Sequence, residues 1–345
     1  MRNDTRPFHQ SLALTNFTAF SDVNMEFVPG VNVIIGENGT GKTHILKALY
    51  AVHSASRNGF DSVRGKLARV FQVNLDSLIR RSQMTTASAK IEGSFGGTPW
   101  LHEFYKDGNP GSPIHDTLPV DRDLFPKEVV FIPAIDMMGH TKGFLSIYQH
   151  REIDFDETLN DIVANLLLPP LKELSGEQAK LIEGLEKILG GKLELEGERF
   201  YLTDTRGRFE MPAIAEGLRK VATLIRLVQV GALGPGSTLF WDEPEVNLNP
   251  IIMDEVVGAI LALARSGVQV FLATHSYVIL KELDLQLGKD EEARFFALNP
   301  AEAGTEVSSF DDFTQLQPNA ILNQYSSLYD RELSRATRRP VKRAN

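Results

Sequence analysis

The sequence contains no cysteine and only two tryptophans among its 345 residues. The missing cysteine excludes a disulfide framework, a thiolate metal site and a thiol nucleophile. No apolar stretch approaches the roughly 18 uninterrupted residues that a membrane-spanning helix requires. The first residues, MRNDTRPFHQ, are charged and lack an apolar segment, so we expect no signal peptide. Together these absences predict a cytoplasmic protein without a membrane partner.

Positive charge is also in short supply, with 36 Lys and Arg against 45 Asp and Glu and a formal net charge of −9. A protein that binds DNA mainly by releasing counterions is usually basic. Nucleic acid is therefore a weakly indicated partner, although the arginine-rich end from Arg331 onward leaves a local basic patch open. Apolar residues make up 42% of the chain, enough for a sizeable core in one large domain or two smaller ones.

A glycine-rich segment near the N-terminus, GENGTGKT, fits the P-loop pattern. The apolar run Gly30–Ile35 before it predicts a buried strand, and Lys42–Val52 after it has the apolar spacing of a helix. In that setting, backbone N–H groups and a helix N-terminus favour phosphate binding. We expect Lys42 to contact the β- and γ-phosphates and Thr43 to bind Mg²⁺. The predicted nucleotide-binding residues are Gly36, Glu37, Asn38, Gly39, Thr40, Gly41, Lys42 and Thr43.

Two later strands are each predicted to end in polar residues. The run Thr238–Trp241 is followed by Asp242 and Glu243, and an acid in that position binds the Mg²⁺ of a P-loop site. We therefore assign Asp242 to the metal and Glu243 to the attacking water, as general base or orienting group.

The run Val268–Ala273 is followed by Thr274, His275 and Ser276 at the ligand edge of a parallel sheet, where His275 could contact the γ-phosphate or the water. The other seven histidines are interpreted as surface or packing residues.

The order of these motifs resembles the ABC-type ATPases, and within them the RecF/OLD-like (AAA_21-type) branch. The similarity is closest in Leu12–Leu49, in DEPEVNLNP and in LATHS, although Asn249 stands where that branch often has histidine. The resemblance implies an α/β fold: a P-loop ABC-ATPase head with an N-terminal antiparallel sheet and an inserted helical lobe. It also implies ATP and Mg²⁺ as cofactors, and a homodimer or higher homo-oligomer that closes around two ATP molecules.

In such a dimer, the signature loop of one copy completes the ATP site of the other. The position implied here is the start of the predicted helix in Met211–Leu233, where the usual Leu-Ser-Gly-Gly is replaced by IAEG. Ala215 and Gly217 are the implied nucleotide contacts, and the serine hydroxyl is absent at Ala215. Arg219 or Lys220 could supply charge instead. In this family, the Q-loop residue bridges the metal to a movable lobe. Two positions are candidates for it here, the segment after Pro133 and Gln72. Each is more simply explained as a surface or packing position.

We expect one ATPase head over residues 1–345. Its parts would be an N-terminal sheet and P-loop lobe (1–135), an inserted helical lobe and hairpin (136–210), a signature, Walker B and switch lobe (211–310) and a helical, basic tail (311–345). Residues 156–190 are predicted to be helical with a break at Pro169-Pro170, too short for a long coiled-coil arm. The predicted hairpin before Met211 would turn near residues 205–208.

The leading functional hypothesis is an ATPase whose dimerisation controls a separate effector protein such as a nuclease or toxin. The altered signature could make its hydrolysis slow. Small ATPases that resemble this chain are often paired with effectors in anti-phage defence. The alternative hypothesis is a RecF-like repair or recombination ATPase that binds DNA directly. A transporter subunit and a P-loop kinase are disfavoured, the first by the N-terminal segment and altered signature, the second by Glu243.

Overall fold

The fold is described here from a computed structural model, which describes residues 8–58, 63–80, 88–106, 115–117, 128–151, 153–289, 291–316 and 320–338. A central sheet has the strand order β14-β13-β3-β12-β11-β7. The pairs β13–β3, β3–β12, β12–β11 and β11–β7 are parallel, and β14 is added antiparallel at the edge. The strands are β3 (Val31–Gly36), β7 (Val129–Ile132), β11 (Thr238–Asp242), β12 (Gln269–Thr274), β13 (Ala293–Ala301) and β14 (Gly304–Phe310).

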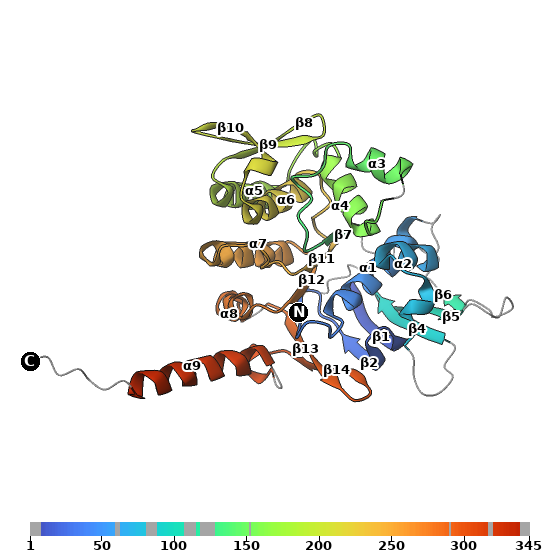
Figure 1. Ribbon diagram of the computed structural model, residues 1–345. Helices are drawn as coiled ribbons and strands as arrows, with labels where there is room; N and C mark the ends of the chain where they lie inside the picture. The colour runs from blue at the N-terminus through green and yellow to red at the C-terminus, as the bar shows by residue number, and fades with distance from the viewer. Residues whose placement is uncertain are drawn as a thin grey trace, which may run out of the picture.

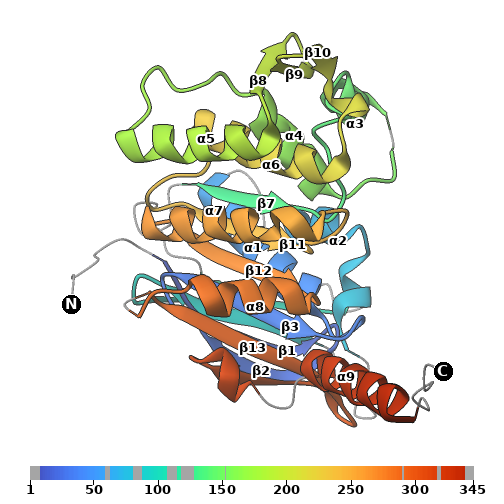
Figure 2. The same cartoon turned by 90° about the vertical axis from the view of Figure 1, so that its left-hand side faces the viewer.

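The middle strands of this sheet are buried on both faces. Every residue of β3, β11 and β12 is buried, as their continuous apolar runs require. Helices α7 (Met253–Arg265) and α8 (Tyr277–Gln286) lie over one face, and the P-loop helix α1 (Lys42–Asn58) lies over the other (Figures 1 and 2). The predicted apolar face of α1 is confirmed, because Ile45, Leu46, Leu49 and Val52 have no exposed surface.

A second, antiparallel sheet packs on the far side of α1, with the order β2-β1-β4-β5-β6. Its strands are β1 (His9–Phe17), β2 (Phe20–Glu26), β4 (Ser88–Phe95), β5 (Thr98–Tyr105) and β6 (His115–Thr117). The turn at Gly96-Gly97 joins β4 to β5, and both glycines have positive φ. One apolar cluster joins this sheet to α1, to the short helices α2 (Val63–Phe71) and η1 (Leu75–Leu78), and to Phe240 and Phe271 of the central sheet. The prediction of an N-terminal antiparallel sheet on an α/β core is therefore confirmed.

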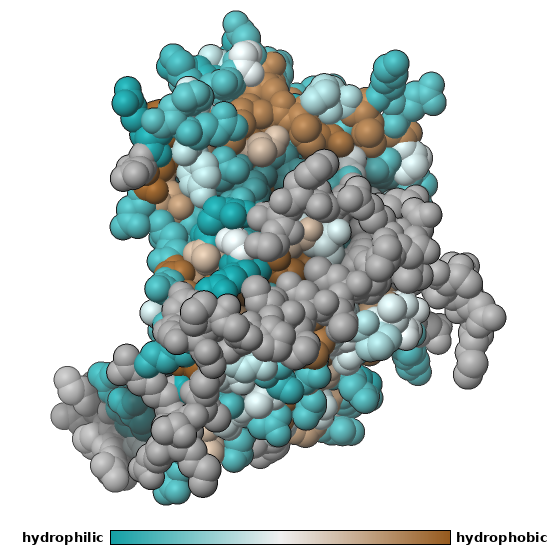
Figure 3. All heavy atoms as spheres, turned by 90° about the vertical axis from the view of Figure 1, so that its right-hand side faces the viewer, coloured by the Kyte–Doolittle hydropathy of each residue, from teal (hydrophilic) through white to brown (hydrophobic). Residues whose placement is uncertain are grey.

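Helices form the upper lobe of the molecule in Figures 1 and 2. They are α3 (Phe144–His150), α4 (Glu157–Leu167), α5 (Gly176–Leu189) and α6 (Glu216–Gln229). The predicted break at Pro169-Pro170 separates α4 from α5, and α5 restarts with a capping box between Ser175 and Gln178. Apolar side chains gather over this lobe in the space-filling view of Figure 3.

The predicted hairpin before α6 is a three-stranded antiparallel sheet of β8 (Lys192–Glu196), β9 (Arg199–Asp204) and β10 (Gly207–Glu210), followed by the short helix η3 (Met211–Ala213). The predicted turn near residues 205–208 joins β9 to β10. A further turn joins β8 to β9 at Gly197, whose φ of 61° suits glycine. The prediction of a single hairpin was therefore incomplete.

The chain continues after β14 through η5 (Phe313–Gln315) to helix α9 (Ala320–Arg338). Figure 1 shows α9 projecting from the body of the molecule. The basic end of the chain lies partly outside the described residues, which stop at Arg338. The division of the chain at residues 135, 210 and 310 stays a prediction. Within the described part of the chain, no helix has the length and apolarity that crossing a membrane requires.

Candidate active site

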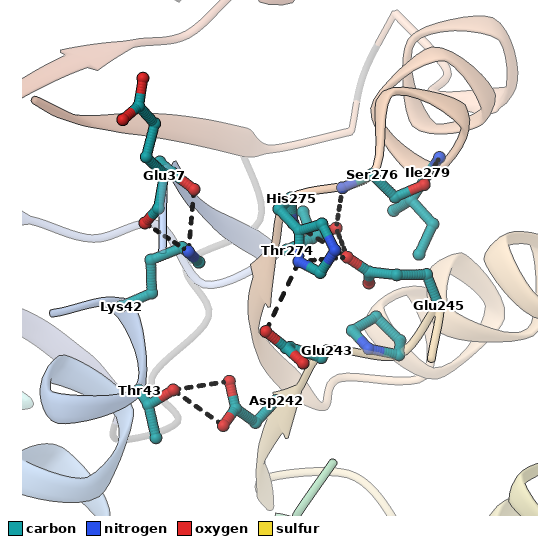
Figure 4. A network of polar contacts seen from close by, with 12 residues as sticks. Glu37, Lys42, Thr43, Asp242, Glu243, Glu245, Thr274, His275, Ser276 and Ile279 are labelled. Atoms are coloured by element: carbon teal, nitrogen blue, oxygen red, sulfur yellow. Dashed lines mark hydrogen bonds and ion pairs between the residues drawn. The ribbon is translucent and has the colours of Figure 1, made fainter. Parts of the chain in front are cut away.

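Three adjacent parallel strands bring the predicted motifs to one edge of the central sheet. The P-loop follows β3, Asp242 ends β11, and Thr274 ends β12, which lies between the other two strands. Carboxyl ends of parallel strands meet at the same edge, so residues almost two hundred positions apart become neighbours. Figure 4 shows Lys42, Thr43, Asp242, Glu243 and His275 turned toward this common region.

The P-loop is a tight turn in which close contacts leave no room for a side chain at two of the glycines. A Cβ on Gly36 would lie 2.7 Å from the Thr40 hydroxyl and 2.8 Å from the Leu298 carbonyl oxygen. Gly41 has a φ of 97°, and a Cβ there would lie 2.6 Å from the Phe20 ring. The turn between them, Glu37–Gly39, is exposed. The loop therefore has an exposed segment, Glu37–Gly39, above a closely packed base, as a phosphate-binding loop requires.

Lys42 lies beneath the exposed segment of the loop and is only 6% exposed. Its Nζ donates to the carbonyl oxygens of Gly36 at 2.8 Å and Glu37 at 2.9 Å. Burial lowers the pKa of Lys42, while the nearby carboxylates of Glu243 and Asp242 oppose that shift. A desolvated ammonium ion held at the base of the loop is suited to bind phosphate oxygens.

Thr43 and Asp242 are in direct contact. The Thr43 hydroxyl lies 2.9 Å from one carboxylate oxygen of Asp242 and 3.1 Å from the other. Burial, together with Glu243, raises the pKa of Asp242 to about 6, against the opposing hydrogen bond from Thr43. A buried carboxylate next to a hydroxyl offers the oxygen ligands that Mg²⁺ prefers, and a cation there would offset the cost of burying the charge. The two residues fit a Mg²⁺ site.

Glu243 follows Asp242 with a strained backbone. Its φ is 47°, unusual for a residue other than glycine, and its N–H donates to the carbonyl of Ala273 on β12 at 2.9 Å. Its side chain is 29% exposed, and Oε1 lies 3.5 Å from Nδ1 of His275. The turn thus directs the Glu243 carboxylate away from the sheet and toward His275 (Figure 4).

Glu245 is a member of this site to which the sequence analysis assigned no role. Its Oε1 accepts from the Thr274 hydroxyl at 2.8 Å and from the backbone N–H of His275 at 2.9 Å, and lies 3.4 Å from Nδ1 of His275. This carboxylate fixes the start of the segment that positions His275. The only sequence signal was the spacing Asp-Glu-Pro-Glu, which placed Glu245 close to two assigned acids.

The signature-like turn lies beside the loop after β11. Ala215 is the exposed N-cap residue of α6 and makes no side-chain cap bond. A Cβ on Gly217 would lie 2.7 Å from the carbonyl oxygen of Asn247 and 3.2 Å from the Leu248 Cα. Figures 1 and 2 show α6 in the upper lobe, whereas the P-loop lies at the central sheet.

The two cations considered as replacements for the missing hydroxyl are both bound within the chain. Arg219 Nε lies 2.9 Å from Asp136, and the Arg219 side chain is 13% exposed. Lys220 is 2% exposed and donates to main-chain carbonyl oxygens in the loop after β11. Both side chains are thus engaged within their own chain, and a charge supplied by either of them stays a prediction.

The remaining open positions have structural surroundings. Gln72 is exposed and donates to Asp154 at 3.0 Å, which agrees with a surface role. Asn249 caps the short helix η4 (Pro250–Ile252) through the N–H of Ile251 at 3.1 Å. His9 and His53 are buried and lie 2.9 Å apart through their ring nitrogens, in an aromatic packing cluster.

Comparisons with known proteins agree with this geometry. Two family models match: one described as "AAA domain, putative AbiEii toxin, Type IV TA system" over residues 137–281, and one described as "AAA domain" over residues 11–96. These matches support the assignment to the RecF/SMC-like branch of the ABC-type ATPases that the sequence suggested.

Two curated relatives indicate the range of this branch. The DNA replication and repair protein RecF of Bifidobacterium longum subsp. infantis is 33% identical over 85 residues, which are 23% of this chain and 20% of RecF. The DNA double-strand break repair Rad50 ATPase of Methanocaldococcus jannaschii is 24% identical over 203 residues, which are 56% of this chain and 18% of Rad50. The chain thus spans about a fifth of the length of these ABC-ATPase relatives.

Solved structures show the same fold at low identity. An Smc head bound to the C-winged helix domain of ScpA matches with a TM-score of 0.56 and 13% identity, covering 88% of this chain and 98% of that one. The SMC head domain from Thermotoga maritima gives a TM-score of 0.51 at 14% identity with the same coverage. These matches confirm the predicted ABC-ATPase head fold.

Proposed function

We propose that this ABC-type ATPase binds Mg²⁺ and ATP at the P-loop and hydrolyses the γ-phosphate. The observation that supports this most strongly is the contact between Thr43 of the P-loop and Asp242 of a distant strand. A glycine turn with an incidental lysine would not require a buried acid to meet it. Glu243 lies next in the chain to that acid and is part-exposed, as a residue that must reach water should be.

In the proposed reaction, the Glu243 carboxylate takes a proton from a water molecule. The water oxygen forms a bond to the γ-phosphorus, and the bond from that phosphorus to the bridging oxygen breaks with its electron pair leaving on ADP. Lys42 and the N–H groups of the P-loop hold the phosphates. Mg²⁺, held by Thr43 and Asp242, would neutralise charge on the phosphate oxygens.

His275 is proposed to orient the Glu243 carboxylate and to respond to the γ-phosphate. Its Nδ1 lies 3.5 Å from Glu243 and 3.4 Å from Glu245, and 44% of its side chain is exposed. A half-exposed imidazole between two carboxylates can move toward a ligand while its backbone stays bound to Glu245.

We further propose that two copies close around two nucleotides, with Ala215 and Gly217 of one copy facing the ATP of the other. The exposed turn at Ala215 and the SMC head likeness support this arrangement. A partner protein would then read the closed state, as a separate protein, ScpA, binds the Smc head. The match to a model described with a putative AbiEii toxin supports the proposal that this ATPase controls a separate effector in defence, and we place the protein in the cytoplasm as part of that proposal.

A direct role in DNA repair is the alternative, favoured by the likeness to RecF and Rad50. Binding of the isolated protein to duplex DNA, measured across a salt series, separates the two. A strong fall in affinity with salt would favour the alternative. Copurification of a protein partner without DNA, from cells that express the neighbouring genes, would favour the effector switch.

The activity itself is tested by release of phosphate from ATP with and without Mg²⁺. We expect Mg²⁺-dependent turnover that is lost in Lys42→Ala and in Glu243→Gln, but kept in Lys187→Ala, a change on the exposed surface of α5. Absence of both nucleotide binding and turnover in the purified wild-type protein would contradict the proposal.

A further inference from the structure

A buried lysine on α6 binds the main chain that carries the proposed base. Lys220 lies one turn after the signature-like residues and is only 2% exposed. Its Nζ donates to the carbonyl oxygen of Glu243 at 3.1 Å, with the carbonyl oxygen of Pro244 at 3.5 Å. A charged donor in a buried site is a costly feature, and such groups are seldom kept unless they are fully engaged.

The carbonyl that Lys220 binds belongs to the strained residue of the site. Glu243 has a φ of 47°, a conformation that a residue with a side chain adopts only when its surroundings stabilise it. Its N–H is bound to Ala273 of β12, so the main chain is fixed from the sheet on one side. Lys220 fixes it from the helical lobe on the other. The direction of the Glu243 carboxylate depends on both contacts.

The charge of Lys220 is balanced from several elements. Burial lowers its pKa, and the carboxylates of Glu245, Glu216, Asp136 and Glu243 oppose that shift. These acids come from the loop after β11, from the start of α6 and from the segment after β7. The ammonium ion therefore binds the loop after β11 and lies in the field of acids from two further segments.

The N-terminus of α6 contacts the same loop a second time. Gly217 packs against Asn247 and Leu248 so closely that a Cβ would lie 2.7 Å from the Asn247 carbonyl oxygen. Asn247 is itself in the left-handed region, with a φ of 60°. A shift of the signature-like turn would thus reach the loop through Gly217 and the Glu243 main chain through Lys220.

We propose that Lys220 is a positioning residue that holds the main chain of Glu243 in its active conformation and so couples the signature-like turn of α6 to ATP hydrolysis. This inference rests on the proposed function. It assigns to α6 a role within its own chain, in addition to any contact that its N-terminus makes with a second copy.

The test is a series at position 220: Lys220→Arg keeps a charged donor, Lys220→Gln keeps only a neutral donor, and Lys220→Met has no donor. Turnover (kcat) is expected to rank in that order, with at least a tenfold loss in Lys220→Met. The KM and the Kd for Mg²⁺-ATP should change less than threefold, because the P-loop is untouched. Lys187→Met, on the exposed surface of α5, is the matched control and should match the wild type. Equal kcat across all folded variants would overturn the proposal; if the Met variant does not fold, the comparison of Arg with Gln decides.

A double variant separates positioning from general structural support. In Glu243→Gln, residual single-turnover hydrolysis should fall less than threefold further on adding Lys220→Met, since the base through which Lys220 acts is already gone. A full multiplicative loss would show that Lys220 supports another part of the enzyme and would overturn the proposal. If Glu243→Gln hydrolyses ATP at the wild-type rate, the assignment of Glu243 as the general base is wrong. A wild-type rate in Lys220→Met alone contradicts only the role proposed for Lys220.

Discussion

The two halves expected of an ABC-type ATP site differ in how far this chain completes them. The P-loop half is assembled within the chain. Lys42 donates a hydrogen bond to the carbonyl oxygen of Gly36 at the base of the loop, and Thr43 is in contact with Asp242. The signature-like half, at Ala215–Gly217, is a turn whose N-cap residue is exposed and makes no side-chain bond. In one half the predicted ligand-binding side chains are already in contact, whereas the other half carries Ala215 where the resemblance implies a serine hydroxyl.

This difference teaches where binding and turnover can separate. Binding residues are supported by buried contacts that one copy supplies, so nucleotide affinity should depend mainly on them. The signature-like turn influences the same site from α6, through Gly217 and Lys220. Changes at the turn should therefore alter rate and stability more than affinity. The following predictions test that contrast.

The largest expected effect is on turnover in Glu243→Gln. Loss of a general base typically costs about 10²- to 10⁴-fold in rate. Affinity for Mg²⁺-ATP should stay within a few-fold of the wild type, because Lys42, Thr43 and Asp242 are unchanged. Phosphate release and equilibrium binding of a fluorescent ATP analogue measure the two quantities. Wild-type turnover would show that another group activates the water.

Lys42→Ala should affect binding itself. Removing the buried ammonium ion is expected to weaken Mg²⁺-ATP binding about 100-fold, which corresponds to about 2.7 kcal/mol. It also leaves the carbonyl oxygens of Gly36 and Glu37 without their donor. Titration calorimetry measures the affinity, with Lys187→Ala as the control. An affinity within threefold of the wild type would break the contrast between the two halves.

Asp242→Asn should stabilise the nucleotide-free protein at neutral pH. The pKa of Asp242 is raised to about 6 by burial, from about 3.9 in an unfolded chain, so the folded wild type loses stability as the pH rises between these two values. The asparagine variant has no such loss, so above pH 6 it should gain up to about 3 kcal/mol. Below pH 4 the difference should vanish.

Denaturant unfolding across pH, in the absence of Mg²⁺ and nucleotide, measures this difference. Asp22→Asn, at an exposed position of β2, is the control and should show no comparable gain. In the presence of Mg²⁺ and ATP the order should reverse, because the wild type gains stability from binding and the variant does not. A less stable variant at pH 7.5 without ligand would contradict the buried-charge argument.

Gly217→Ala tests the close packing of the signature-like turn. The added Cβ would meet backbone atoms of Asn247 and Leu248, so we expect a loss of about 1–3 kcal/mol in unfolding free energy, together with slower turnover. The matched control is Gly184→Ala on α5, where the added Cβ meets nothing within 4 Å. That variant should be about 0.5–1 kcal/mol more stable, since alanine favours a helix over glycine.

Ala215→Ser should have the smallest effect. A serine at the N-cap of α6 can accept a hydrogen bond from the first turn and stabilise the protein by about 1 kcal/mol. It also restores the hydroxyl that the family presents to the γ-phosphate, so turnover should stay at or above the wild-type rate. Thermal unfolding and phosphate release check both points. Slower turnover would indicate that the turn has been shaped for another purpose.

Much of this molecule follows from local sequence patterns. Buried apolar runs predict β3, β11 and β12, and because parallel strands end at one edge of a sheet, the P-loop is expected next to Asp242. The break at Pro169-Pro170 follows from proline chemistry, whereas the antiparallel sheet was expected from the resemblance to the ABC-type ATPases.

The contacts that the sequence left out depend on packing between distant elements. Nothing near Lys220 in the chain indicates that its ammonium ion reaches the Glu243 carbonyl, and Lys220 was instead considered as a charge for a partner. Glu245 stood in a recognised motif, yet its bond to Thr274 requires β11 and β12 to lie side by side. The sequence analysis predicted no turn at Gly197, because the turn follows only from the pairing of β8 with β9.

The most direct test of the central claim, that one copy supplies a complete binding half and a second copy the remainder, is the mass of Glu243→Gln in solution with Mg²⁺ and either ATP or ADP. We predict that the 38.3 kDa chain doubles in mass with ATP and stays single with ADP. Dimer formation with ATP should also be lost in Lys42→Ala/Glu243→Gln. A single chain under both conditions, with ATP demonstrably bound, would contradict the account.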